Sequence, residues 1–557
     1  MRKRPIKVFF VFVFLILLGF TTPFSSDANY EEQDYFEITK NLKILASIYE
    51  KINTLYVDEP IPGELMKIGI DAMLESLDPY TVFIPESNIE DYRFMTTGQY
   101  GGIGAIIKKI DNQLIITEPY ENSPAQLSGL KAGDIILEVD GETTKGRSLE
   151  EMSNLLKGAA ETTVDIKYSR NNELKQISVL RKKIEVPAVP YYGMLEKNIG
   201  YIKLTTFTDK ASIEIVKGLT ELKSNHNMEK VIIDLRGNGG GLLGEAVNIV
   251  NLFISKDQKV VETKGRIQEI NRVYKTRNNP FDLSIPVIVL IDSYSASASE
   301  IVAGSLQDLD RGVVIGNRSF GKGLVQQTKD IKFGAKVKLT VAKYYTPSGR
   351  CIQKLDYSNK NQFGDVFEVA DSLIQTFYTK NGREVKDSRG VDPDIKVESG
   401  FYSRLSEVLI YNDYIFKYVN KYVDENEALS SINEFNLSDN DYSLFKEYII
   451  AEDVKYTNES SERLNELIAS SEREKYYTYN KDVYEGLKVS LKPNLSKDLE
   501  RYKEEIIEVL ENEIIARYFY QKGRVEASLK KDPYILKAVS VFNGPTRYNK
   551  ILNPSEE

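Results

Sequence analysis

The chain has 557 residues, 28% of them charged, and a net charge of −9 at neutral pH. This length exceeds what one hydrophobic core organises and predicts about three or four domains. No basic surface field is indicated, so nucleic acid is not an expected partner. The chain contains one cysteine, Cys351, and one histidine, His226. This excludes a disulfide framework, a zinc cluster and a metal site built on several imidazoles, and neither a metal nor a cofactor is predicted.

The single histidine also restricts hydrolase chemistry. His226 lies in a polar stretch between a helical pattern and a strand pattern, which predicts a solvated loop residue. A nucleophilic serine in this chain would therefore need a lysine or a carboxylate as its base.

Residues 1–28 have the pattern of a signal peptide. Four basic residues precede an uninterrupted apolar stretch at 8–20, which is short for a membrane span. No cysteine follows it, which excludes a lipoprotein anchor, and Ala28 is the candidate cleavage position. We predict an exported protein of the bacterial periplasm or cell envelope, with an uncleaved membrane anchor as the alternative.

Residues 29–95 are predicted to be a helical region. Apolar residues recur at three- and four-residue spacings between positions 42 and 52 and again between 66 and 77. Pro79 then ends the second helix. The pattern predicts packing rather than chemistry.

Residues 96–183 change to short β-type runs with many glycines. A Gly-rich segment at 100–105 precedes an apolar pair, and a second glycine-containing segment at 129–136 ends in another apolar pair. Their order and spacing resemble a PDZ domain, in which a Gly-rich loop offers backbone amides to a peptide's terminal carboxylate and a strand edge adds the peptide. The helix predicted over 150–156 would flank the groove. The resemblance implies a peptide-binding loop made of Gly102, Ile103 and Gly104.

Between residues 184 and 399, strand and helix patterns alternate. Strands are predicted over 201–204, 231–235, 260–261, 287–291 and 336–346, and helices over 211–222 and 242–253. The alternation predicts a layered α/β core with a mostly parallel sheet. Residues 354–380 are interpreted as an insertion, and 400–557 as a helical extension without recognisable chemistry.

The segment 239–244 has the spacing of a dinucleotide-binding fingerprint, with an acidic residue, Glu262, further on. Three residues, 236–238, separate it from the preceding strand, whereas a Rossmann turn starts directly after its strand. An arginine and successive glycines suit a wide loop with exposed amides better. Nucleotide binding here stays open as an alternative.

The segment 316–322 matches a phosphate-binding loop through its terminal glycine–lysine pair. Gly323 follows where such a loop needs a Mg²⁺-binding serine or threonine, and no helix pattern begins there. Because both missing features are needed for the mechanism, an NTPase is not predicted.

A serine-rich run follows the strand predicted over 287–291. Ser297 and Glu300 have the spacing of a capping box at the start of a helical pattern, and capping alone would explain this pair. A hydroxyl at a helix start together with Lys322 between two glycines is also the combination that a Ser/Lys hydrolase needs.

Four motifs together resemble the C-terminal processing peptidases, also called tail-specific proteases. They are Asp234-Leu235-Arg236 with 238–241, the run 295–300, the segment 320–323 with Gln326, and the segment 345–350. The resemblance covers roughly residues 40–397 and implies an α/β protease core of the crotonase/ClpP-like type. The predicted domains are a signal peptide (1–28), an N-terminal helical region (29–95), an inserted PDZ-like domain (96–183), the protease core (184–399) and a helical C-terminal extension (400–557).

Carried over by position, the resemblance assigns Ser297 as the nucleophile, Lys322 as its general base and Gln326 as the residue that orients the lysine. The lysine can accept a proton only when neutral, which requires burial to lower its pKa from about 10.4. A neutral amide can hold the amine without restoring its charge. For the oxyanion, the resemblance and the helix start indicate the amides of Gly240 and Ala298, with Gly241 as the alternative to Gly240.

The leading hypothesis is a serine endopeptidase that captures protein tails with apolar C-termini through the PDZ domain and cleaves them. A PDZ scaffold without catalysis and a nucleotide-binding protein are the alternatives. The expected partners are protein or peptide substrates bound by their C-termini. A homo-oligomer or an adaptor is left open, and membrane association depends on an uncleaved N-terminal segment.

Overall fold

The computed structural model describes residues 32–553, except 363, 399, 401, 427, 430 and 433. The predicted signal peptide therefore lies outside the described residues. No helix within the described ranges is long and apolar enough to cross a membrane. The chain divides into two compact units, Met1–Leu74 and Glu75–Glu557, and each is considered by itself.

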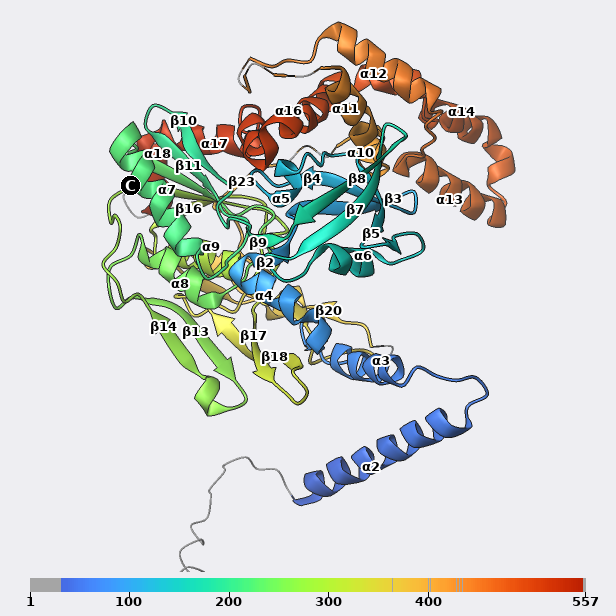
Figure 1. The fold of residues 1–557 in the computed structure, drawn as a ribbon. Coiled ribbons are helices and arrows are strands. Elements are labelled where there is room, and N and C mark those ends of the chain that lie inside the picture. Colours follow the sequence, from blue (N-terminus) through green and yellow to red (C-terminus); the bar gives the residue numbers. More distant parts are fainter. Residues whose placement is uncertain are drawn as a thin grey trace, which may run out of the picture. The chain divides into compact units, whose positions relative to one another are not determined.

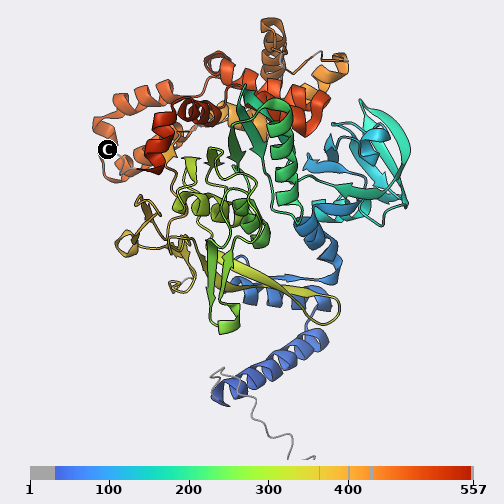
Figure 2. The same ribbon diagram turned by 90° about the vertical axis from the view of Figure 1, so that its left-hand side faces the viewer.

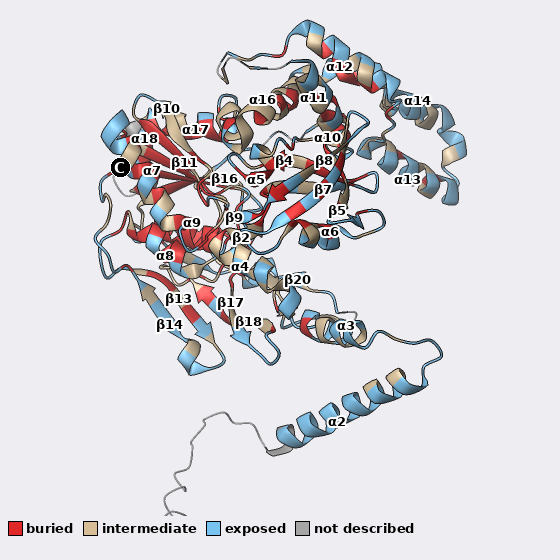
Figure 3. Cartoon of the chain, viewed as in Figure 1, coloured by how far each residue is buried: buried red, intermediate tan, exposed pale blue. Residues whose placement is uncertain are grey.

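Two helices make up the described part of the first unit. They are α2 (Glu32–Leu55) and most of α3 (Pro62–Glu75), as the periodicity predicts. The Tyr49 hydroxyl joins them by donating to the carbonyl oxygen of Pro62 at 2.8 Å. Much of α2 is exposed, including the apolar side chains of Leu42 and Leu45 (Figure 3).

A six-stranded sheet lies at the centre of the second unit. Its order is β10-β11-β12-β15-β16-β23, and every neighbouring pair is parallel except β10 and β11. The strands are β10 (Tyr191–Glu196), β11 (Ile199–Lys203), β12 (Lys230–Asp234), β15 (Val287–Ile291), β16 (Gly312–Gly316) and β23 (Ile395–Lys396). The mostly parallel α/β core is confirmed, and β15 has the predicted bounds.

Both faces of this sheet are covered by helices, because alternate strand residues point to opposite sides. One face packs against α7 (Ala211–His226), α8 (Leu243–Asn251) and α9 (Ala298–Asp308). The other face packs against α17 (Pro533–Phe542) and α18 (Pro545–Leu552), which lie beside β11 and β16 (Figure 1 and Figure 2).

The predicted helical extension after residue 400 is present, and its last helices, α17 and α18, pack on the central sheet. Ile535 and Phe542 of α17 share one buried cluster with Ile232, Ile288 and Val313 of the sheet. These helices thus complete the protease core, although several hundred residues separate them from its first strands. No sequence signal indicates this packing, because the apolar pattern of these helices is common to all amphipathic helices.

A second, five-stranded sheet lies beside the first. Its order is β1-β18-β13-β14, with β17 also paired to β18. The strands are β1 (Val82–Ile84), β13 (Lys259–Gly265), β14 (Arg272–Lys275), β17 (Leu324–Asp330) and β18 (Lys336–Tyr345). The strands predicted over 260–261 and 336–346 belong to this sheet.

The PDZ-like region is built on a sheet of order β3-β4-β5-β7-β8, with β6 paired to β5. Its elements are β3 (Ala105–Ile110), β4 (Gln113–Pro119), α5 (Pro124–Leu127), β5 (Ile135–Val139), β6 (Glu142–Thr143), α6 (Leu149–Leu156), β7 (Thr163–Arg170) and β8 (Glu173–Leu180). Before and after it, β2 (Gln99–Gly102) pairs with β9 (Lys182–Glu185). The short helix α4 (Ile89–Thr97) precedes β2.

The helices between residues 404 and 528 have a buried core of their own. They are α10 (Arg404–Tyr411), α11 (Tyr414–Glu425), α12 (Asp439–Ala451), α13 (Glu459–Arg473), α14 (Lys481–Leu491), α15 (Leu495–Arg501) and α16 (Lys503–Ser528). The segment interpreted as an insertion contains β19 (Leu355–Asp356), β20 (Phe367–Glu368) and β21 (Thr376–Tyr378), and β21 pairs with β22 (Glu384–Lys386). His226 is exposed as predicted, but it ends α7 instead of lying in a loop.

Candidate active site

Ser297 lies where the chain leaves β15 and enters α9. Its φ of 56° and ψ of −111° place this non-glycine residue in a strained backbone region. Such strain is typical of functional sites, because the surrounding structure has to impose it. The Tyr344 hydroxyl donates to the carbonyl oxygen of Ser297 at 3.1 Å and helps to hold this conformation.

Glu300 joins the serine segment to the lysine segment. Its side chain is fully buried and accepts the backbone N–H of Ser297 at 2.8 Å, one half of the predicted capping box. The same carboxylate accepts the N–H groups of Gly321 at 2.7 Å and Lys322 at 2.9 Å, and the Ser319 hydroxyl at 2.5 Å. One buried carboxylate therefore fixes the backbone at both residues to which the family resemblance assigns catalytic roles.

The side chain of Lys322 lies against an aromatic ring. Its Nζ is 4.0 Å from the centroid of the Tyr80 ring, a cation–π contact. No hydrogen bond joins Lys322 to Ser297 or to Gln326 among the described residues. Ser297 and Lys322, the predicted dyad, line one cavity, but the Lys322 ammonium contacts the Tyr80 ring and not the serine.

Tyr80 is held in place by the turn before β1. Asp78 is buried and accepts the N–H groups of Tyr80 and Thr81 at 2.8 and 2.9 Å. β1 then pairs with β18, which places this turn beside the lysine. The sequence pattern predicts the end of a helix in this segment, and its position at the site was not predicted.

Burial, followed by the positive charge of Lys338, lowers the pKa of Lys322, and Glu300 and Asp78 oppose the change, so that the resulting pKa is about 8. Lys338 lies on β18 and lines the same cavity, and burial lowers its pKa as well. A lysine with this pKa has a neutral fraction near neutral pH, as a general base requires. Burial and a lowered pKa are the environment predicted for Lys322.

Gln326 lines the cavity but does not hold the lysine in this structure. Its side-chain amide donates to the Thr340 hydroxyl at 3.1 Å, across the β17–β18 pair. The N–H of Thr340 donates in turn to the Thr81 hydroxyl at 3.2 Å. Gln326 thus connects β17 to the turn that carries Tyr80, and the predicted Gln326–Lys322 contact is absent from the described contacts.

The glycines after β12 approach the serine closely. A side chain at Gly240 would meet Ser297 Cβ at 2.9 Å and the nitrogen of Ala298 at 3.0 Å, and Gly240 has a φ of 102°. Only glycine fits both the contact and the conformation. This loop and the start of α9 therefore form one surface beside the Ser297 side chain.

The choice of Gly240 as an oxyanion donor is corrected by its hydrogen bond. Its N–H donates to Asn238 Oδ1 at 2.9 Å and is therefore occupied. Within the described residues, the N–H groups of Gly241 and Ala298 donate no hydrogen bond. Ala298 retains its predicted place, and Gly241 is the better second donor in this geometry.

The cavity at the serine has a volume of about 630 Å³. Apolar side chains form much of its wall, so it suits an extended peptide with apolar side chains. They come from α4, from the start of α8, from α9 and from β17, and they are Phe94, Met95, Leu243, Ile301, Leu324 and Val325.

The predicted PDZ loop borders a separate cavity of about 140 Å³. Ile103 lines it together with Ala105 and Ile107, and Leu156 of α6 lies opposite. The N–H groups of Ile103 and Gly104 donate no hydrogen bond among the described residues, whereas their carbonyl oxygens accept those of Ala125 and Tyr120. Free amides next to β3, an edge strand, are what carboxylate capture and strand addition need. Gly102 precedes them as the last residue of β2.

The remaining motif, 345–350, contacts the C-terminal end of α9. Arg350 is fully buried and donates to Asp308 at 2.8 Å near the end of that helix. The Thr346 hydroxyl also donates to Asp308, at 2.5 Å. This motif therefore anchors the helix whose first turn carries Ser297.

The nucleotide look-alikes do not have the surroundings of nucleotide sites. The segment 316–322 leads into the strand β17, whereas a phosphate-binding loop leads into a helix. Glu262 lies on β13, in the other sheet, so it is not placed beside the loop at 239–244 as a ribose ligand would be.

Three family models match the chain. The model of peptidase family S41 matches residues 198–358, a PDZ domain model matches 115–170, and the model described as "Probable PDZ-protease, C-terminal helical domain" matches 405–542. These ranges agree with the α/β core, the PDZ region and the helical region.

Curated relatives are similar over much of the chain. The carboxy-terminal-processing protease of Bartonella bacilliformis is 35% identical over 355 residues, which are 63% of this chain and 80% of that protein. A probable CtpA-like serine protease of Staphylococcus haemolyticus is 33% identical over 315 residues, 56% of this chain and 63% of that protein.

Solved structures were also found. The photosystem II D1 C-terminal processing protease is 26% identical with a TM-score of 0.35, covering 64% of this chain and 92% of that chain. The peptide-bound PDZ domain of a carboxy-terminal protease from Vibrio cholerae is 28% identical with a TM-score of 0.15, covering 16% and 99%. On the family and relative matches, this chain is a PDZ-containing serine protease and belongs to the carboxy-terminal-processing proteases of peptidase family S41.

Proposed function

We propose that this protease uses Ser297 and Lys322 as a catalytic dyad and acts on C-terminal tails that its PDZ domain captures. The observation that carries the dyad is the position of Glu300, whose buried carboxylate holds the backbone N–H groups of both residues. Both residues line one cavity with apolar walls, where a lysine of lowered pKa lies near a strained serine.

In the proposed reaction, neutral Lys322 takes the proton of the Ser297 hydroxyl while Oγ attacks the scissile carbonyl carbon. The carbonyl oxygen becomes an oxyanion that accepts hydrogen bonds from the N–H groups of Ala298 and Gly241. The lysine then gives its proton to the leaving amine, and an acyl-enzyme remains. Water releases the acyl group by the same steps, with the lysine as base again.

The reaction requires Lys322 Nζ to leave the ring of Tyr80. The cation–π contact favours the charged ammonium, and it weakens when the amine is neutral. Loss of the proton therefore frees the side chain to turn towards Ser297. Gln326 lies on β17, the strand that follows Lys322 in the chain, and is available to orient the neutral amine once it has moved.

Tail capture is supported by the PDZ loop. The free N–H groups of Ile103 and Gly104 would bind a terminal carboxylate, and the edge of β3 would pair with the peptide backbone. The apolar lining of Ile107 and Leu156 suits tails with apolar C-terminal residues. Gly102 would give the loop its close approach to the ligand.

We further propose that the protein is exported to the periplasm or cell envelope, on the basis of the charged and apolar pattern of residues 1–28. Fractionation of cells producing the full chain, followed by mass spectrometry of its N-terminus, tests both export and cleavage. Recovery of the intact chain in the cytoplasm would contradict this proposal.

The mechanism is tested with the chain from residue 29 onward and its Ser297→Ala and Lys322→Ala variants. Each is incubated with an unfolded protein that ends in small apolar residues, and products are followed by mass spectrometry. We expect cleavage by the parent alone, with no effect of a metal chelator.

The same experiment separates the alternatives. Equal cleavage by all three proteins would show that the site assignment is wrong. Tail binding without cleavage by any of them would favour a scaffold or an enzyme that needs an activating partner. Tail binding is measured with a fluorescent peptide and its C-terminally amidated form, which lacks the carboxylate.

A further inference from the structure

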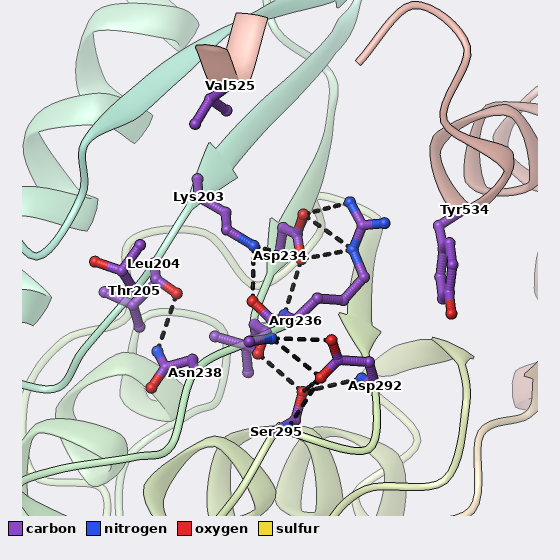
Figure 4. Close-up of polar contacts among 12 residues, drawn as sticks. Lys203, Leu204, Thr205, Asp234, Arg236, Asn238, Asp292, Ser295, Val525 and Tyr534 are labelled. Atoms are coloured by element: carbon purple, nitrogen blue, oxygen red, sulfur yellow. Dashed lines mark hydrogen bonds and ion pairs between the residues drawn. The ribbon is translucent and has the colours of Figure 1, made fainter. Parts of the chain in front are cut away.

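The loop that carries the oxyanion glycines starts at Arg236, directly after β12. Its guanidinium donates to Asp234 at 2.6 Å, and Asp234 is fully buried. The carbonyl oxygen of Arg236 accepts Lys203 Nζ at 2.8 Å. Arg236 is thus held on both its side chain and its backbone at the base of the loop (Figure 4).

Two residues at the start of α17 complete the surroundings of Arg236. Asp532 Oδ2 lies 2.7 Å from Arg236 Nη2, and both side chains are largely buried. The ring of Tyr534 lies 4.6 Å from Arg236 Cζ, on the side away from Asp234 (Figure 4). Without Asp532, the set of Lys203, Arg236 and Asp234 carries an excess positive charge, and Asp532 neutralises it.

Tyr534 also reaches the loop that carries the lysine. Its hydroxyl accepts a hydrogen bond from Asn317 Nδ2 at 2.8 Å, and Asn317 follows β16 directly. The next residues of that loop include Ser319, Gly321 and Lys322, which Glu300 holds. Tyr534 therefore contacts the first residue of each of the two loops at the site, Arg236 and Asn317.

Movement at Arg236 is transmitted to the serine because the loop is tightly packed. Asn238 donates to the carbonyl oxygen of Leu204 at 2.9 Å and accepts the N–H of Ala296 at 3.0 Å. Gly240 has no free space against Ser297, so a shift of the loop changes the position of the oxyanion donor.

We propose that Asp532 and Tyr534 are positioning residues of the catalytic site. Through Arg236 and Asn317 they hold two loops, 236–241 with the oxyanion donor and 317–323 with Lys322, in position relative to Ser297. This inference rests on the proposed dyad, because it concerns the geometry of that site. It gives the C-terminal helices a role in the reaction beyond covering the sheet.

The test uses Asp532→Asn and Tyr534→Phe in the chain from residue 29 onward. Asp532 caps α17 by accepting the N–H of Tyr534 through Oδ1 at 2.8 Å, and asparagine keeps this acceptor but loses the charge. Tyr534→Phe keeps the ring over Arg236 but removes the acceptor of Asn317. Asp439→Asn is the matched control, since it breaks an exposed ion pair with Lys503 in the helical region.

We measure kcat and KM for peptide cleavage, and the rate at which a fluorophosphonate labels Ser297 with loss of fluoride. We expect Asp532→Asn to lower kcat and the labelling rate about tenfold, with KM changed by less than about twofold, because neither residue lines the substrate cavity. Tyr534→Phe is expected to give a smaller loss of the same kind, and Asp439→Asn none.

A purely structural role predicts a different result. If both variants melt at lower temperature but retain the parent's kcat and labelling rate per folded molecule, the inference is overturned. If Asp532→Asn does not fold, Tyr534→Phe decides by the same criteria. Cleavage by Ser297→Ala at the parent's rate would instead overturn the proposed dyad, so the two failures are distinguishable.

Discussion

The side chain of Lys322 lies directly against the ring of Tyr80, with Nζ 4.0 Å from the centre of the ring. The ring favours the ammonium form, whereas burial and Lys338 disfavour it. Since the proposed reaction needs the neutral amine, these opposing effects should set the pH range in which the enzyme works.

Activity should rise with pH through the pKa of Lys322, which is about 8. The base is active without its proton, so its active fraction is about one tenth at pH 7 and about nine tenths at pH 9. We expect kcat to increase about tenfold between these values and then to level off. A flat profile over this range in initial-rate measurements would contradict the assignment of Lys322 as base.

Lys338→Met should move this profile to higher pH. Removing the neighbouring positive charge makes protonation of Lys322 easier, so its pKa rises and activity at pH 7 falls. The measurement is the midpoint of kcat against pH for the variant and the parent. Lys336→Met, on the same strand with a surface partner in Asp330, is the control and should leave the midpoint unchanged.

Glu300→Gln should impair both stability and catalysis. The carboxylate accepts four hydrogen bonds, and a glutamine side chain would present its NH₂ group to some of these donors. We expect a loss of about 2–3 kcal/mol in the free energy of unfolding, from the unsatisfied buried donors, and a fall in kcat of at least about a hundredfold. Denaturant titration and initial rates check the two parts, and a fully active variant would contradict the role of Glu300.

Gly240→Ala should abolish most activity, because the new methyl group would lie 2.9 Å from Ser297 Cβ and the backbone there has positive φ. We expect kcat to fall at least about a hundredfold. Gly244→Ala is the comparison, since it lies in α8 with open space around it and should add about 0.5–1 kcal/mol of helix stability. Equal kcat in the two variants would show that the close contact is unimportant.

Tail binding should depend on one face of the edge strand β3. Ile107→Asp places a charge in the PDZ cavity and should weaken binding of an apolar peptide tail at least about tenfold. Ile106→Asp is the control, because the neighbouring side chain is exposed on the opposite face. Fluorescence anisotropy with a labelled peptide measures both, and equal weakening would place the tail elsewhere.

Much of the fold follows from local patterns in the sequence. The strand over 287–291 and the helix over 211–222 were predicted because a buried apolar run and a helical period are local signals. The placement of Ser297 and Lys322 at one cavity also agrees with the sequence analysis. That agreement came from a family resemblance, since spacing alone cannot bring two loops together.

The contacts that the sequence did not predict are long-range and polar. Tyr80 reaches Lys322, and Asp532 reaches Arg236, through chain pairings that leave no periodic signal. The Gly240 amide was wrongly chosen as an oxyanion donor because its bond to Asn238 depends on the exact turn of the loop. The segment at Pro79 was interpreted as a helix end. Its position at the site depends on the pairing of β1 with β18, which also leaves no periodic signal.

The position of α17 and α18 has a consequence for biosynthesis. The sheet strands emerge from the ribosome well before these helices, so the face containing Ile232 and Ile288 lacks this cover until α17 and α18 are made. A chain truncated before Pro533 would leave this apolar face exposed and should be prone to aggregation.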